Sequence, residues 1–172
     1  AVAQPNAPYP IDSAPKGPTA ILVVDDEEPI QSALKRFLSQ QGYEVSTASN
    51  GAGALDVLNR QKIACVLLDV RMPDANGLDL VPKILEIEPN AAILMLTAVN
   101  DAASAALCMQ RGAMDYLTKP VDLTDLLRAI QRALRRRDTI IESQQINHWL
   151  KEEVAIRTAE LRMERANLER IS

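Results

Sequence analysis

The chain has 172 residues, of which 47% are hydrophobic and 24% charged, and its formal net charge is -4. This length suffices for one full-sized domain with a substantial core and an accessory element, but not for two large domains. The mild negative charge gives no reason to expect a direct nucleic-acid surface or a membrane surface, and the composition favours a cytoplasmic protein.

The N-terminal segment AVAQPNAPYPIDSAPKGP contains half of the chain's prolines and little that could form a core. We therefore interpret residues 1–17 as a disordered arm. The segment lacks the basic flank and apolar core of a signal peptide, and no window has the apolar length of a membrane span. We expect no membrane contact.

From Thr19 onward, short apolar runs alternate with amphipathic stretches. The apolar runs predict strands, and the stretches with an apolar residue every three or four positions predict helices. This alternation indicates βαβ crossovers and a parallel sheet covered on both faces. The predicted strands are 19–25, 43–48, 63–69, 91–98 and 113–119, and the predicted helices between them are 27–41, 51–61, 77–88 and 101–112.

Several apolar positions are expected in the core. Cys65 and Cys108 lie within apolar segments and are interpreted as small buried side chains rather than as metal ligands. One face of the first predicted helix carries Ile30, Leu34, Phe37 and Leu38.

The sequence after Pro120 contains no glycine and no proline, which predicts one long helix. Its first part should pack on the sheet, so we place the main domain at residues 18–138 and a coiled-coil helix at residues 139–172. The side chains expected to pack on the sheet are Leu126, Leu127, Ile130 and Leu134.

The distal part of this helix fits an imperfect heptad pattern. Asn147 at an a position is typical of a residue that fixes register in a two-stranded coiled coil, so we favour a parallel homodimer over a lone solvated helix. Trp149, Ile156 and Met163 form a second apolar stripe. The a positions are Ile140, Asn147, Val154, Leu161 and Leu168, and the d positions are Ser143, Leu150, Arg157, Glu164 and Ile171.

Chemically active side chains lie at the carboxyl ends of the predicted strands, where open parallel sheets bind ligands. The first strand ends in Asp25 and Asp26, the third in Asp69, the fourth in Thr97 and the fifth in Lys119. Three carboxylates in one cleft repel each other unless a cation neutralises them, and oxygen ligands favour Mg²⁺. A phosphoryl group would then find an attacking oxygen on Asp69 and two donors, Thr97 and Lys119.

Each residue also has a structural interpretation when it is considered alone. Asp25 or Asp26 could be the N-cap of the first helix, Asp69 could form an Asx turn, and Lys119 could be a solvated strand end. The occurrence of all of them at strand ends favours the functional interpretation.

The motifs ILVVDDE, VLLDVRMPDANGLDL, LMLTA and GAMDYLTKP together resemble the receiver domain of bacterial two-component response regulators, over about residues 19 to 138. The resemblance implies a flavodoxin-like (βα)5 fold, in the α/β class, with strand order 2-1-3-4-5. It also implies that Asp69 accepts a phosphoryl group from a sensor histidine kinase or a phosphotransfer protein.

The same resemblance implies the other site residues. Asp26, Asp69 and the Arg71 backbone carbonyl would hold Mg²⁺, and Asp25 would complete the metal site through a bound water. Lys119 would contact the phosphoryl oxygens, with a cis peptide bond to Pro120, and the backbone of Arg71 and Ala98 would contact the phosphate.

The resemblance further implies a switch, in which the Thr97 hydroxyl moves toward the phosphoryl group and the Tyr116 ring follows it inward. Tyr116 could instead be a half-buried strand aromatic with a solvated hydroxyl. The positions of Arg71 and Val99 vary across the family and tune the lifetime of the acyl phosphate.

The segment LKEEVAIRTAEL resembles the signalling helices that join a receiver to an output domain, commonly a cyclic-dinucleotide phosphodiesterase, a cyclase or a kinase. We therefore expect a piece of a longer response regulator that signals through its dimeric helix and is not itself an enzyme. The alternatives are a non-switching dimerisation scaffold and an aspartyl-phosphate hydrolase, and the latter lacks the expected DxD start because Val70 and Arg71 follow Asp69.

Overall fold

The computed structural model describes residues 17–171, which fall into two units, 17–138 and 139–171. The arm expected at residues 1–17 lies outside the described residues, apart from Gly17. The two units are described separately below.

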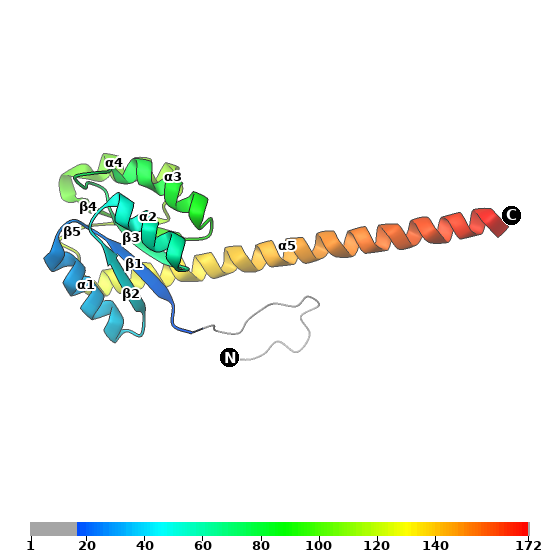
Figure 1. Ribbon diagram of the computed structural model, residues 1–172, viewed down its shortest axis with the longest axis horizontal. Coiled ribbons are helices and arrows are strands. Elements are labelled where there is room, and N and C mark those ends of the chain that lie inside the picture. Colours follow the sequence, from blue (N-terminus) through cyan, green and yellow to red (C-terminus); the bar gives the residue numbers. More distant parts are fainter. Residues whose placement is uncertain (1–16, 172) are drawn as a thin grey trace. The chain divides into compact units, whose positions relative to one another are not determined.

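The first unit is built on one sheet of five parallel strands in the order β2-β1-β3-β4-β5 (Figure 1). This confirms the predicted α/β fold and strand order. The register pairs Asp69 with Leu96, so the residue after Leu96, Thr97, lies at the same edge of the sheet as Asp69. The strands are β1 (Ala20–Val24), β2 (Glu44–Ala48), β3 (Cys65–Asp69), β4 (Ala92–Ala98) and β5 (Asp115–Lys119).

The helices follow the predicted alternation with one difference. The segment expected to be helical from residue 101 begins with a 3-10 turn, η1 (Val99–Asp101), before the α-helix. It ends before Gly112, whose φ of 123° is accessible mainly to glycine. The α-helices are α1 (Glu28–Gln40), α2 (Gly51–Arg60), α3 (Gly77–Ile87), α4 (Ala102–Gln110) and α5 (Leu123–Ile171).

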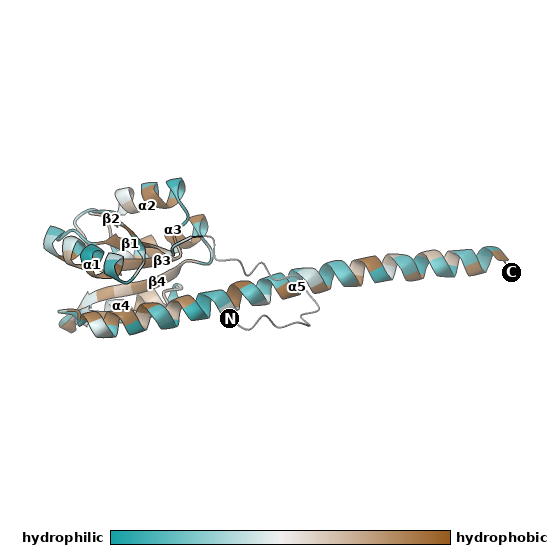
Figure 2. Ribbon diagram, turned by 90° about the horizontal axis from the view of Figure 1, so that it is seen from below, coloured by the Kyte–Doolittle hydropathy of each residue, from teal (hydrophilic) through white to brown (hydrophobic). Residues whose placement is uncertain are grey.

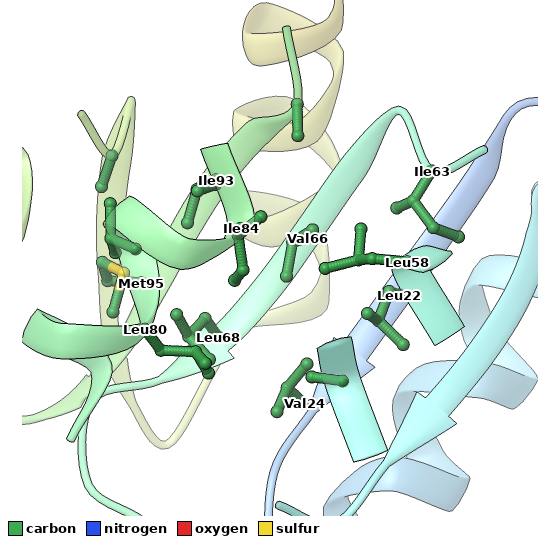
Figure 3. Packing of buried hydrophobic residues seen from close by; sticks show 14 of the residues in the cluster. Leu22, Val24, Leu58, Ile63, Val66, Leu68, Leu80, Ile84, Ile93 and Met95 are labelled. Carbon is green, nitrogen blue, oxygen red and sulfur yellow. The ribbon is translucent and has the colours of Figure 1, made fainter. Parts of the chain in front are cut away.

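Alternate strand residues point to opposite faces of the sheet, and each face carries its own apolar cluster. Leu22, Val66 and Ile93 lie on the face covered by α2, α3 and α4, where they pack with Leu58 and Ile84 (Figure 3). The opposite face packs against α1 and α5. The central strands are therefore buried on both sides, which explains their nearly continuous apolar sequences.

The first part of α5 packs on the sheet, although with a different set of side chains from the predicted one. Leu126 and Ile130 are buried as expected, but Ala129 and Ala133 complete the buried stripe. Leu134 packs at the edge of the cluster, and Leu127 is only half-buried. Small alanine side chains let the helix approach the sheet closely, and a search for large apolar residues overlooks them.

Other core predictions are confirmed. Cys65 and Cys108 are buried free thiols, and burial raises the pKa of Cys65 to about 12. Leu34 and Leu38 of α1 are buried, while Ile30 and Phe37 pack at the edge of the same cluster.

The second unit, residues 139–171, is the distal part of α5, on which apolar and polar residues alternate (Figure 2). Apolar side chains at the predicted a and d positions are exposed, from 37% at Ile140 through 63% at Val154 to 82% at Ile171. Within residues 17–171, no helix combines the length and the apolar content needed to cross a membrane.

Candidate functional site

Three predicted site residues meet at the carboxyl edge of the sheet. Asp25 directly follows β1, while Asp69 and Lys119 are the last residues of β3 and β5. The Lys119 Nζ atom lies 2.8 Å from Asp25 Oδ2 and 3.2 Å from Asp69 Oδ2, so one ammonium group bridges two carboxylates. The Lys119 side chain is only 20% exposed, and this rules out a solvated strand end. Its peptide bond to Pro120 is cis.

Burial determines the electrostatics of this cluster. Burial raises the pKa of Asp69, Asp25 adds to the effect by repulsion, and together they outweigh the opposing attraction of Lys119. Burial alone would lower the pKa of Lys119, but its hydrogen bonds and charge contacts with Asp25 and Asp69 raise it above its usual value. The surroundings therefore favour the charged form of Lys119 and disfavour the charged form of Asp69.

Asp26 belongs to a neighbouring acidic group. One carboxylate oxygen from each of Asp25, Asp26 and Glu27 lies within 4.8 Å of the others, and only Asp25 of the three is buried. The N-cap alternative is wrong, because Glu27 occupies the N-cap position of α1 and makes no side-chain cap bond. Asp25 Oδ1 instead accepts a hydrogen bond of 2.9 Å from the Glu27 backbone N–H.

This arrangement fits a hard divalent cation. Carboxylate oxygens are the ligands that Mg²⁺ prefers, and Asp25 belongs both to the acidic group and to the Lys119 bridge. Burial is the main cause of the raised pKa of Asp69, with a smaller contribution from the Asp25 charge, and a bound cation would oppose both by stabilising the charged carboxylate. Asp26 shares the acidic group with Asp25, and Asp69 shares Lys119 with Asp25, so these three carboxylates are chemically suitable donors, next to the backbone of Arg71.

The loop after Asp69 holds the carboxylate in place. The Arg71 backbone N–H donates to Asp69 Oδ1 at 3.2 Å, which is the hydrogen bond of an Asx turn. The Asx interpretation therefore holds together with the Lys119 contact. A Cβ at Gly77 would lie 3.1 Å from Val70 Cα and 3.2 Å from the Asp69 carbonyl oxygen, so the start of α3 can approach this loop only as glycine.

Thr97 is buried in β4, but its hydroxyl is directed to the end of this strand and the turn that follows it. The Thr97 Oγ1 atom lies 3.2 Å from the carbonyl oxygens of both Ala98 and Asp101, to which it donates. The described contacts of Thr97 thus do not include Asp69. Tyr116, the other predicted switch residue, is exposed, with 42% of its surface accessible.

Three polar residues around the site were missed from the sequence. Asp101 pairs with Arg71, Ser104 donates to Asp101 Oδ1 at 2.7 Å, and Gln31 is buried beside the ends of β1 and β2. The Gln31 side-chain amide donates to the Asp25 carbonyl oxygen and, at 3.0 Å, to Ser49 Oγ. The spacing of three residues between Asp101 and Ser104 indicates a side-chain contact at the start of a helix. Gln31 lies on the apolar face of α1, where the sequence pattern predicts only core packing.

Comparison with known proteins identifies the family. The model of the response regulator receiver domain matches residues 21–131. The chain belongs to the response regulator receiver family. This match covers the five strands, apart from Ala20 at the start of β1, and the first part of α5.

Individual relatives agree with this assignment. The chain is 39% identical over 114 residues to the DNA-binding transcriptional regulator NtrC of Azospirillum brasilense, a match covering 66% of this chain and 24% of the relative. It is 32% identical over 127 residues to the regulatory protein TorR of Escherichia coli, covering 74% and 55%. The chain therefore matches only about a quarter to a half of the length of these relatives.

A solved receiver domain from Clostridium thermocellum is 38% identical, has a TM-score of 0.67, and matches over 71% of this chain and 98% of its own. The structural match thus spans nearly the whole of an isolated receiver domain. The phosphoacceptor chemistry of such domains is consistent with the cluster around Asp69.

Proposed function

We propose that Asp69 accepts a phosphoryl group from the phosphohistidine of a sensor kinase or a phosphotransfer protein, in a reaction that requires Mg²⁺. The observation that carries this proposal is the Lys119 ammonium, which contacts both Asp69 and Asp25 at the edge of the sheet. It provides a fixed positive charge beside a carboxylate oxygen that is buried but close to the surface. This combination suits a carboxylate that must receive a phosphoryl group, whose three oxygens share its negative charge.

In the proposed reaction, an Asp69 carboxylate oxygen forms a bond to phosphorus as the bond from phosphorus to the donor histidine nitrogen breaks. That nitrogen retains the electron pair, and the product is an acyl phosphate on Asp69. Lys119 stabilises the negative charge on the transferred oxygens, and the Arg71 N–H orients the carboxylate. Asp25, Asp26, Asp69 and the Arg71 carbonyl would hold Mg²⁺, which neutralises phosphoryl charge when bound.

Intact mass spectrometry after incubation with acetyl phosphate and Mg²⁺ tests this step. We expect one phosphoryl adduct on the wild type, loss of the adduct when Mg²⁺ is chelated, and no adduct on Asp69→Asn. Asp79→Asn, an exposed carboxylate in the first turn of α3, is the matched control and should be phosphorylated normally. Absence of an adduct, or one that survives Asp69→Asn, would overturn the proposal.

The proposed switch uses Thr97 and Tyr116. A phosphoryl group on Asp69 would draw the Thr97 hydroxyl from the Asp101 carbonyl, and the backbone N–H groups of Arg71 and Ala98 would contact its oxygens. The exposed Tyr116 ring would then turn inward. The exposure of Tyr116 and the present hydrogen bonds of Thr97 support this direction of change.

We further propose that the phosphorylated state is transmitted through a dimeric coiled coil of residues 139–171 to an output module. The exposed apolar a and d positions support this role. The signalling-helix pattern favours a cyclase or a cyclic-dinucleotide phosphodiesterase as the output, and the receiver itself would act as a phosphoacceptor and not as a turnover enzyme. Hydrolysis of a phosphate ester by this chain would contradict that role.

The exposed apolar a and d positions of residues 139–171, called the seam below, also suit a second function, that of a dimerisation scaffold that does not switch. Sedimentation of the chain with and without acetyl phosphate separates the two functions. A change in association with phosphorylation supports the switch, whereas a dimer of unchanged affinity and unchanged partner binding supports the scaffold.

A further inference from the structure

Arg71 links the proposed phosphoacceptor to the segment that directly follows Thr97 and the end of β4. Its backbone N–H donates to Asp69 Oδ1 at 3.2 Å, and its side-chain Nε donates to Asp101 Oδ2 at 2.7 Å. Thus two segments that follow different strands, β3 and β4, are tied by one residue. The Arg71 side chain is 78% exposed, whereas that of Asp101 is 11% exposed.

Asp101 is fixed by more than this ion pair. Its second carboxylate oxygen accepts the 2.7 Å hydrogen bond from Ser104, and its backbone carbonyl lies 3.2 Å from the Thr97 hydroxyl oxygen. Asp101 therefore joins the guanidinium of Arg71 and the hydroxyl of Thr97 through different atoms. As the last residue of η1 and the N-cap of α4, it connects the site to that helix.

The Thr97 hydroxyl has a single hydrogen, so a bond to the Asp101 or Ala98 carbonyl competes with a bond to a phosphoryl oxygen. Any contact that holds Asp101 in its present place also preserves the present partners of Thr97. The Arg71 ion pair is such a contact, because it restrains the loop from the side of the phosphoacceptor.

We propose that Arg71 and Asp101 are positioning residues, whose ion pair holds the loop between β4 and α4 in the conformation that keeps Thr97 away from Asp69. This inference rests on the proposed phosphoacceptor function and adds a specific restraint to it. In this proposal the pair is lost when the loop moves, so that breaking it by substitution shifts the receiver toward the conformation in which Thr97 contacts a phosphoryl group. By linkage, a phosphoryl analogue then binds more tightly.

Beryllium fluoride with Mg²⁺, a non-covalent phosphoryl analogue, provides the test on the full chain. The midpoint of a beryllium titration at fixed fluoride and Mg²⁺ is measured from amide NMR signals for the wild type, Asp101→Asn, Arg71→Gln and the double variant. We expect the midpoint of each single variant to fall about two- to fivefold, the range for loss of a partly exposed ion pair. The double variant should match the singles, because one contact is lost in all three.

Asp56→Asn is the matched control, because it breaks the exposed pair between Asp56 and Arg60 on α2, whose atoms lie 3.1 Å apart. Its midpoint should equal that of the wild type. Asp101 is the N-cap of α4, so its substitution can also disturb the fold. Arg71→Gln breaks the same ion pair from an exposed side chain and serves as the check on this effect. Damage to the fold would weaken binding of the analogue rather than strengthen it.

Unchanged or weaker binding in Asp101→Asn, or additive gains in the double variant, would overturn the inference. Weaker binding in Arg71→Gln alone would assign the guanidinium to the phosphoryl group itself and would also overturn it. If the wild type gives no titration at all, the proposed phosphoacceptor function fails, and the inference fails with it. A wild-type titration with unchanged variants rejects only the positioning role.

Discussion

Lys119 balances two buried carboxylates with one positive charge, and this imbalance is the central feature at the scale of single residues. Asp25 is fully buried and Asp69 is 7% exposed, so water offers them little solvation. The raised pKa of Asp69 already includes the attraction of Lys119, so the charged carboxylate is disfavoured in the folded state even with its partner present. The ionised Asp69 carboxylate therefore destabilises the folded protein at the site of the proposed chemistry.

Asp69→Asn should accordingly raise the free energy of unfolding at neutral pH in the absence of divalent cations. A group whose folded pKa is raised contributes stability that is complete below its unfolded pKa, about 3.8, and is lost as the pH rises through the folded value. The gain in the variant should therefore be largest at neutral pH and vanish in acid. Urea denaturation of both proteins over this pH range checks the prediction, and a less stable variant at neutral pH would contradict it.

At the scale of elements, α5 combines two kinds of surface in one continuous helix. Near its start, Leu126 and Ala129 are buried against the sheet, whereas Leu161 and Leu168 in the distal part are at least 65% exposed. The first surface contributes to the core of the receiver. The second surface stabilises the fold only when another apolar surface covers it.

Leu126→Ala should lower the free energy of unfolding by about 2–5 kcal/mol, because it leaves a cavity in a fully buried position. Leu107→Ala on α4 is the control, because that side chain is 48% exposed, and its effect should be less than half as large. Denaturant titrations followed by circular dichroism provide the measurement. Equal losses in the two variants would show that α5 is not packed as described.

At the scale of the whole molecule, the charges beside the proposed seam are consistent with a parallel pair of helices. In the heptad frame, Glu160 occupies a g position and Arg165 the following e position, and these meet between the chains of a parallel dimer. In the single chain, Arg165 instead lies 3.6 Å from Glu169, one turn further along the same helix. The ion pair within the helix does not prevent the pair between chains, because both are exposed and weak.

Leu161→Glu should weaken self-association at least about tenfold, because it places two carboxylates in the centre of the seam. Ile156→Glu is the matched control. This side chain is 54% exposed and lies on the second stripe, away from the a and d positions, so association should be retained. Sedimentation equilibrium measures both variants, and equal weakening by the two substitutions would place the interface on another face.

The sequence by itself determined the parallel fold and the residue types of the site, because apolar periodicity and the carboxyl-edge rule depend only on local pattern and chain direction. The tertiary structure decided which groups meet. The positions of the side chains determine that Lys119 contacts Asp25 and Asp69. They also determine that Asp26 belongs to a neighbouring acidic group with Glu27. Arg71 and Asp101 are thirty residues apart, and only the packing of the loops after β3 and β4 brings their charges together.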